Sequence, residues 1–172
     1  GNFVCEGIPV TFTATPSNGG SSPSYQWKKN GVNVGTNSST YVHAFTYAEN
    51  GDAITCVITS NSACISGSAT VTSQQILMTV NDIGPVSVAI GIFQASTTVC
   101  AGTQVIVRAS PIHPGLAPTY EFFKNNISQG VQTSNDYIFT PINGDKIKVV
   151  LTSNYTCLTG TNIRTSNTLT LT

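Results

Sequence analysis

Hydrophobic residues alternate with threonine, serine and other polar residues in short runs along the whole chain. Residues 10–15 read VTFTAT, and residues 54–58 read ITCVI. A period of two places successive side chains on opposite faces of a β-strand, so each run predicts a half-buried strand. Turn-forming clusters such as PSNGGSSPS separate the runs, and no segment has the 3.6-residue period of a helix. The pattern predicts an all-β sandwich of several short strands.

The pattern occurs twice. The segment SYQWKKNG matches TYEFFKNN 95 positions later, and YAENGDAITCVITSNSAC matches TPINGDKIKVVLTSNYTC 93 positions later. Self-similarity at a fixed spacing indicates repeated structural modules. We therefore predict two tandem domains, residues 1–82 and residues 83–172.

The second repeat starts with an alternating run that has no counterpart in the first repeat. This run, VSVAIGI, covers residues 86–92, and the matching positions of the first repeat would come before residue 1. We expect the first domain to lack its first strand. The linker, residues 81–85 (NDIGP), is short and rich in turn-forming residues. We expect it to hold the two domains end to end with limited freedom.

Composition narrows the classes of function. Charged residues make up only 8% of the chain, against about 25% in an ordinary soluble domain, and the formal net charge is +0. Binding to nucleic acid needs a basic face, so we expect no nucleic-acid partner. No apolar run approaches the roughly 18 residues of a membrane-spanning helix, so we expect no membrane span. A surface of Thr, Ser and Asn suits a secreted β-protein.

Candidate catalytic groups are few. Asp52 and Asp145 occupy the same position in different repeats, so we expect them to lie one repeat apart. Glycosidase carboxylates lie roughly 5 to 10 Å apart in one cleft, and we interpret both residues as turn-capping corner aspartates. His43 and His113 fall at unmatched positions without a Ser or Cys partner. With no Cys-x-x-Cys and no Asp-rich calcium loop, we expect no enzyme, no metal site and no cofactor.

Aromatic residues on the two matching strands are Tyr25 and Trp27 in the first repeat and Tyr120 and Phe122 in the second. An exposed Trp27 would be the obvious platform for a sugar. Because Trp27 matches Phe122 on a strand whose apolar positions face inward, we expect all four residues to be core anchors.

The segments VCEGIPVTF, YQWKKNG and NGDAITCVITSN resemble the immunoglobulin-like fold of the intermediate type. More specifically, they resemble the tandem Ig-like and PKD-like repeats of giant cell-surface adhesins in Bacteroidetes-type bacteria, including gliding-motility adhesins. The resemblance implies two immunoglobulin-like β-sandwiches, export to the bacterial cell surface, a stalk of many copies, and a role in adhesion or filament building.

The usual disulfide between strands B and F of such domains is missing. Cys56 stands where strand F often has its cysteine, but strand B offers Phe12 and Ala14, and the second repeat has Val149 in place of Cys56. We expect Cys56 to be a buried, unpaired thiol.

Four further cysteines recur, because Cys5 and Cys64 match Cys100 and Cys157. The simplest pairing is one bridge within each repeat, Cys5–Cys64 and Cys100–Cys157. In an immunoglobulin-like sandwich, however, these positions fall at opposite ends of strands that span roughly 23 Å. The alternative is Cys5–Cys157 across the junction, which leaves Cys64 and Cys100 for neighbouring copies. Both schemes remain open at the level of sequence.

Three functions follow as expectations. The first is a structural and adhesive repeat module that acts as a spacer stalk or filament segment of an extracellular surface protein. The second is a self-assembling, pilus-like subunit that is completed by a strand from a neighbouring chain. The third is a carbohydrate-binding accessory module for surface glycans. The expected partners are neighbouring copies of the same repeat, which form a homopolymer in the second case.

Overall fold

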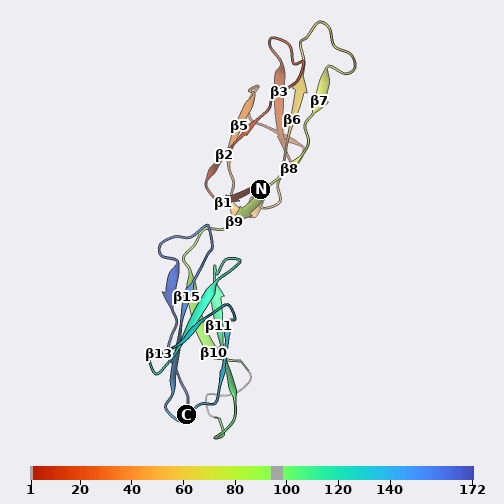
Figure 1. Ribbon diagram of the computed structural model, residues 1–172. Coiled ribbons are helices and arrows are strands. Elements are labelled where there is room, and N and C mark those ends of the chain that lie inside the picture. The colour runs from red at the N-terminus through yellow and green to blue at the C-terminus, as the bar shows by residue number, and fades with distance from the viewer. Residues whose placement is uncertain (1, 94–98) are drawn as a thin grey trace. The chain divides into compact units, whose positions relative to one another are not determined.

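The computed structural model describes residues 2–93 and 99–172, which form two compact units, Gly1–Asp82 (unit 1) and Ile83–Thr172 (unit 2). The regular structure of the described residues is β-strand, apart from the short 3₁₀-helix η1, Tyr47–Glu49. The strands of each unit pack around a core of its own (Figure 1). The predicted all-β class with two β-sandwiches is confirmed.

The strands of unit 1 form a larger sheet and two small pairs. The larger sheet has the order β4-β3-β6-β7, with β8 also paired to β6; β2 pairs with β5, and β1 pairs in parallel with β9. The strands are β1 (Phe3–Cys5), β2 (Pro9–Thr13), β3 (Ser24–Lys29), β4 (Val32–Val34), β5 (Thr40–Ala44), β6 (Ala53–Thr59), β7 (Thr70–Thr72), β8 (Ile76–Leu77) and β9 (Thr79–Asn81).

Unit 2 repeats the larger sheet of unit 1, and its second sheet has one strand more than the β2–β5 pair. Its larger sheet has the order β13-β12-β15-β16, with β17 also paired to β15, and its second sheet has the order β10-β11-β14. The strands are β10 (Ser87–Ile92), β11 (Val105–Ile112), β12 (Thr119–Lys124), β13 (Ile127–Gln132), β14 (Asp136–Phe139), β15 (Lys146–Thr152), β16 (Ile163–Thr165) and β17 (Leu169–Thr170).

The alternating pattern of the sequence forms the two cores. In β6, every second residue is buried, namely Ile54, Cys56 and Ile58. In β15 the same alternation buries Ile147, Val149 and Leu151. A strand that buries one face of a period-two pattern removes its apolar side chains from water without breaking the backbone ladder.

Three of the four aromatic residues expected as core anchors are buried. Trp27 and Phe122 are 3% and 1% exposed, Tyr120 is buried and Tyr25 is half-buried. The Trp27 ring packs 5.9 Å from the ring of Tyr41, and its indole N–H donates to the Ser38 carbonyl at 2.9 Å. A buried indole with a satisfied N–H is a core residue, so Trp27 is no platform for a sugar.

The first strand marks the difference between the units. In unit 2, β11 pairs with β10 on one side and with β14 on the other. In unit 1, β2 pairs only with β5 among the described residues. The short strand β1 precedes β2 but pairs with β9 instead, and the alternation pattern does not predict it.

Candidate functional site

The cysteines fall into two states. Cys5 and Cys157 are disulfide-bonded, whereas Cys56, Cys64 and Cys100 are free thiols. Cys56 is buried, and its burial raises the pKa of the thiol. Cys64 and Cys100 are exposed. Neither within-repeat bridge is therefore formed.

The position of the cysteines in unit 1 explains why Cys5 does not reach Cys64. Cys5 pairs with Asn81 in the β1–β9 ladder, and β9 begins two residues after Leu77, which pairs with Ala53 at the start of β6. Cys64 instead follows the far end of β6. Seven strand residues span roughly 23 Å, whereas a disulfide needs its α-carbons within about 7 Å.

Unit 2 places its cysteines in the same way. The N–H of Val99, next to Cys100, donates to the Thr172 carbonyl at 3.2 Å, and the N–H of Leu171 donates to the Asp145 carbonyl just before β15. Cys157 follows the opposite end of β15. Each unit therefore carries one recurring cysteine at either end of its sandwich.

The repeated TSN motif builds the Cys64 end of unit 1. The Ser60 hydroxyl donates to the Asn18 carbonyl at 2.7 Å, and the Asn61 N–H donates to the Gly19 carbonyl at 3.1 Å. The Asn61 side-chain oxygen then accepts a bond from the Ser22 N–H at 2.9 Å. Two side chains after β6 thus hold the loop after β2 in place.

The same motif builds the Cys157 end of unit 2, almost bond for bond. The Ser153 hydroxyl donates to the His113 carbonyl at 2.7 Å, and the Asn154 N–H donates to the Pro114 carbonyl at 3.2 Å. The Asn154 side-chain oxygen accepts from the Ala117 N–H at 2.9 Å. The two units therefore present end surfaces of one design, each with a recurring cysteine beside it.

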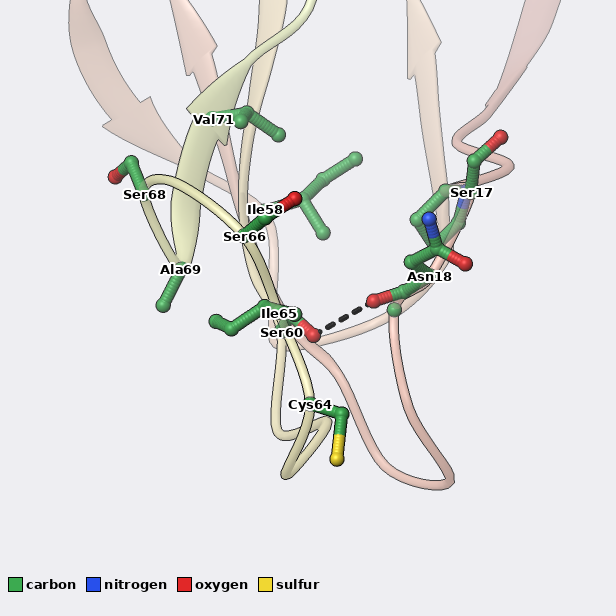
Figure 2. A pocket seen from close by; sticks show the side chains of 12 residues that line it. Ser17, Asn18, Ile58, Ser60, Cys64, Ile65, Ser66, Ser68, Ala69 and Val71 are labelled. Atoms are coloured by element: carbon green, nitrogen blue, oxygen red, sulfur yellow. Dashed lines mark hydrogen bonds between the residues drawn. The ribbon is translucent and has the colours of Figure 1, made fainter.

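At the Cys64 end, unit 1 has an open cavity of about 260 Å³ on its surface. Figure 2 shows Ser17 and Asn18 on one side, Ser68, Ala69 and Val71 on the other, and Cys64 on the loop between them. Its lining is mostly small and polar, and its branched aliphatic side chains are Ile58, Ile65 and Val71.

The corner aspartates are structural. Asn125 donates to Asp145 at 2.8 Å, the Ile142 N–H donates to it at 2.8 Å, and the Lys124 ammonium lies 2.9 Å away. Burial of Asp145 opposes its ionisation, but these three groups outweigh burial and lower the pKa of its carboxyl. In unit 1, Asn30 donates to Asp52 at 2.7 Å. The Lys-Asn and Asn-Gly-Asp motifs thus fasten one turn to another.

Glu49 is a further hydrogen-bonded carboxylate in this corner of unit 1. It accepts hydrogen bonds from the Lys29 ammonium and the Thr46 N–H, which lower the pKa of its carboxyl to about 2. His43 Nε2 lies 3.0 Å from the same carboxylate. Within residues 2–93 and 99–172, no three His, Cys, Asp or Glu side chains are grouped as metal ligands. No helix in these residues is long and apolar enough to cross a membrane.

Comparison with solved structures places the fold among tandem immunoglobulin-like domains. The amphioxus IgVJ-C2 molecule is similar over 98% of this chain and 99% of its own, with a TM-score of 0.52 and 12% identity. Fibronectin(III)-like modules of CbhA from Clostridium thermocellum align over 99% of this chain and 89% of theirs, with a TM-score of 0.42 and 14% identity.

A fragment of Dscam1 with four N-terminal immunoglobulin domains aligns over 98% of this chain, with a TM-score of 0.49 and 14% identity. This chain spans 42% of that fragment's length. No protein-family model and no curated protein sequence matches the chain. At these identities the similarity establishes the fold alone.

Proposed function

We propose that this chain is a non-catalytic spacer segment of an exported bacterial surface protein, of the kind that tandem repeats build in Bacteroidetes-type gliding adhesins. The observation that carries the proposal is that both units have an end surface of the same design with a recurring cysteine beside it. Modules with matching ends are suited to joining in series. The disulfide of Cys5 and Cys157 suits an oxidising, extracellular environment.

We propose that the two disulfide-bonded cysteines are paired with each other at the joint between modules, and contacts within each unit support this pairing. Cys5 pairs with Asn81 in unit 1, and the Cys157 carbonyl accepts a bond from the Gly84 N–H at 3.2 Å in unit 2. Asn81 and Gly84 are three residues apart in the sequence, so the chain between them spans at most about 11 Å. This covalent tether keeps both cysteines within reach, and we assign the bond to Cys5–Cys157.

Peptide mapping without reduction tests the assigned bond. Protein made in an oxidising compartment should yield a fragment in which Cys5 is linked to Cys157, while Cys64 and Cys100 react with a thiol reagent. Recovery of Cys5 linked to Cys64 would overturn the joint. Brief protease treatment of intact cells of the source bacterium tests the location, because a surface protein is removed while a cytoplasmic marker survives.

One observation favours a second function, a subunit that assembles into filaments. Among the described residues β2 pairs only with β5, which leaves one edge of β2 open to a strand from another chain. Sedimentation velocity over a wide range of protein concentrations separates the two functions. Self-association that grows with concentration supports the filament subunit, and a monomer at every concentration supports the spacer.

A further inference from the structure

In unit 2, the segment that enters β10 is seated on the end surface beside Cys157. Gly84 forms a parallel bridge with Leu158, its N–H donates to the Cys157 carbonyl at 3.2 Å, and its carbonyl accepts from the Thr159 N–H at 3.0 Å. His113 Nδ1 lies 3.0 Å from the carbonyl oxygen of the next residue, Pro85. The backbone of this segment is therefore bound like a short added strand.

The next residue of the segment fixes its position. Val86 is 1% exposed, and its carbonyl accepts from the Arg164 guanidinium at 3.1 Å. From there β10 runs antiparallel to β11, from the pair Ser87–Ile112 to the pair Ile92–Val107, and adds Val88 and Ile90 to the core of unit 2. Residues 84–92 thus act as one extended ligand for the rest of the unit.

In unit 2, the residues that bind the segment 84–86 form its seat. The matching residues of unit 1 line the cavity. Cys64, Ile65, Ser66 and Val71 stand 93 positions before Cys157, Leu158, Thr159 and Arg164, and Asn18 stands 95 positions before His113. The cavity shows that the described residues leave this seat open.

The lengths of the matching strands β2 and β11 also indicate that this site is open in unit 1. β11 has eight residues and is paired by β10 up to Ile112, whereas β2 has five residues and ends at Thr13. The four residues that match the end of β11, residues 14–17, lie outside β2. Two of them, Pro16 and Ser17, line the cavity. The edge loses its strand structure where a partner strand is missing.

We propose that unit 1 contains an acceptor site for the linker and first strand of a neighbouring repeat of the same polypeptide. The site comprises the cavity beside Cys64 and the backbone edge of residues 12–17. The ligand is an extended segment with the chemistry of residues 83–92: a glycine that lets two backbones approach, a proline, and then aliphatic residues at every second position. This inference rests on the proposed function, because it names the partner that the series of modules requires.

The contacts expected in the acceptor site follow from those that bind residues 84–86 in unit 2. The Cys64 carbonyl and the Ser66 N–H take the places of the Cys157 carbonyl and the Thr159 N–H, and bind the backbone of the incoming glycine. Ile58, Ile65 and Val71 provide an apolar lining for an aliphatic side chain in the place of Val86. Val71 replaces Arg164, so unit 1 lacks the guanidinium that binds the carbonyl of Val86 in unit 2.

A peptide of residues 83–92, followed by two lysines for solubility, is the probe. In two-dimensional NMR of the isotope-labelled 172-residue chain, we expect the peptide to shift the backbone amides of residues 14–19 and 64–71. The amides of residues 157–164 should not move, because residues 84–86 already fill their seat. A peptide with Asp in place of Val86 is the matched control and should bind at least tenfold more weakly.

Two variants of the chain test the geometry in opposite directions. Val71→Arg restores the group that unit 2 uses and should tighten peptide binding several-fold, whereas Val71→Asp should weaken it. Val71 is 55% exposed on β7, so both variants should leave the fold intact. Equal binding of the two peptides, shifts spread over both units, or no shift at millimolar peptide would overturn the acceptor site.

The molecular size of the chain, measured in the same samples, shows which molecule supplies the natural segment. Self-association of the chain alone that excess peptide reverses would overturn the neighbouring repeat as the source, because a second copy would then supply the segment. If a neighbouring repeat of the same polypeptide supplies it, the chain is monomeric and binds peptide without a change of size. Failure of the peptide experiment leaves the Cys5–Cys157 joint standing, because that joint is measured on other residues.

Discussion

Trp27 shows how one side chain can report on one unit. It packs against Phe12 and Tyr41 in the core of unit 1, and it is the only tryptophan of the chain. Truncation of a buried aromatic ring to alanine costs roughly 3–5 kcal/mol, which is a large part of the stability of a domain of this size. We expect Trp27→Ala to unfold unit 1 or to lower its melting temperature sharply.

Differential scanning calorimetry checks this prediction, because the transition of unit 2 should persist close to its original temperature. Phe122→Ala is the mirror control and should spare unit 1, whose melting is then followed by Trp27 fluorescence. A Trp27→Ala protein with an unchanged melting curve would contradict the assignment of this residue to the core.

Glu49 makes the stability of unit 1 depend on pH. Its pKa is lowered from an ordinary 4.5 to about 2 by the bonds from Lys29 and Thr46. A carboxyl with a lowered folded-state pKa contributes stability that is complete above the ordinary pKa and is lost as the pH falls through the folded pKa. We expect the melting temperature of unit 1, followed by Trp27 fluorescence, to fall between pH 4.5 and pH 2.

Glu49→Gln is the control for this titration. It should melt earlier than the unaltered chain at pH 7, and its melting temperature should fall less steeply in acid. Equal slopes for the two proteins would assign the acid sensitivity to other carboxyl groups.

Among the elements, the loops that carry the end surfaces depend on two matching glycines. Gly20 and Gly115 have positive φ angles of 83°, and a Cβ on them would lie 2.2 Å and 2.1 Å from the side-chain oxygens of Asn61 and Asn154. Gly31 also has a positive φ, of 80°, but a Cβ there would meet nothing within 4 Å.

Alanine substitutions at Gly20 and Gly31 therefore separate the cost of backbone strain from the cost of a steric collision. We expect Gly31→Ala to cost about 1 kcal/mol, the usual strain of a side chain in the left-handed region. Gly20→Ala should cost more, because it also displaces the Asn61 side chain that holds the loop. Urea unfolding followed by Trp27 fluorescence measures both variants, and equal losses of stability would show that the collision is relieved at no cost.

Much of the element level follows from the sequence, because alternation and turn clusters are local signals. The runs around Phe12, Ile54 and Ile147 predict their strands directly. The repeat of TSN is visible in the sequence, but its role depends on the loop that lies opposite, which no local pattern encodes. The strand β1, with three residues, is too short for an alternation signal. The cavity could not be predicted either, because the segments that line it lie far apart along the chain.

On the scale of the whole molecule, the two exposed thiols should be complementary to each other. Cys64 matches Cys157, Cys100 matches Cys5, and Cys5 and Cys157 are the two cysteines that are disulfide-bonded. We therefore expect mild oxidation to link Cys64 of one copy to Cys100 of another. Unlike a random thiol reaction, this link has a direction, and it should produce a ladder of oligomers on a non-reducing gel.

Two serine variants test the direction of the link. Cys64→Ser and Cys100→Ser should each remain largely monomeric when oxidised alone, because neither retains a complementary pair. An equal mixture of the two should form heterodimers. Homodimers of either variant in the same yield would show that the exposed thiols react without selection, while buried Cys56 stays unreactive in every sample.

The proposed Cys5–Cys157 bond would also determine how the chain responds to stretching. A pulling force that enters at Cys5 passes through the disulfide and leaves at Cys157, so the backbone between these residues carries no load. Fully drawn out, that backbone would measure roughly 500 Å. While the bond is formed, the segment can hardly lengthen under force. Once the bond is reduced, the backbone between the two residues can unfold and extend. The redox state of the proposed bond would thus set how far the backbone between these two residues can lengthen under force.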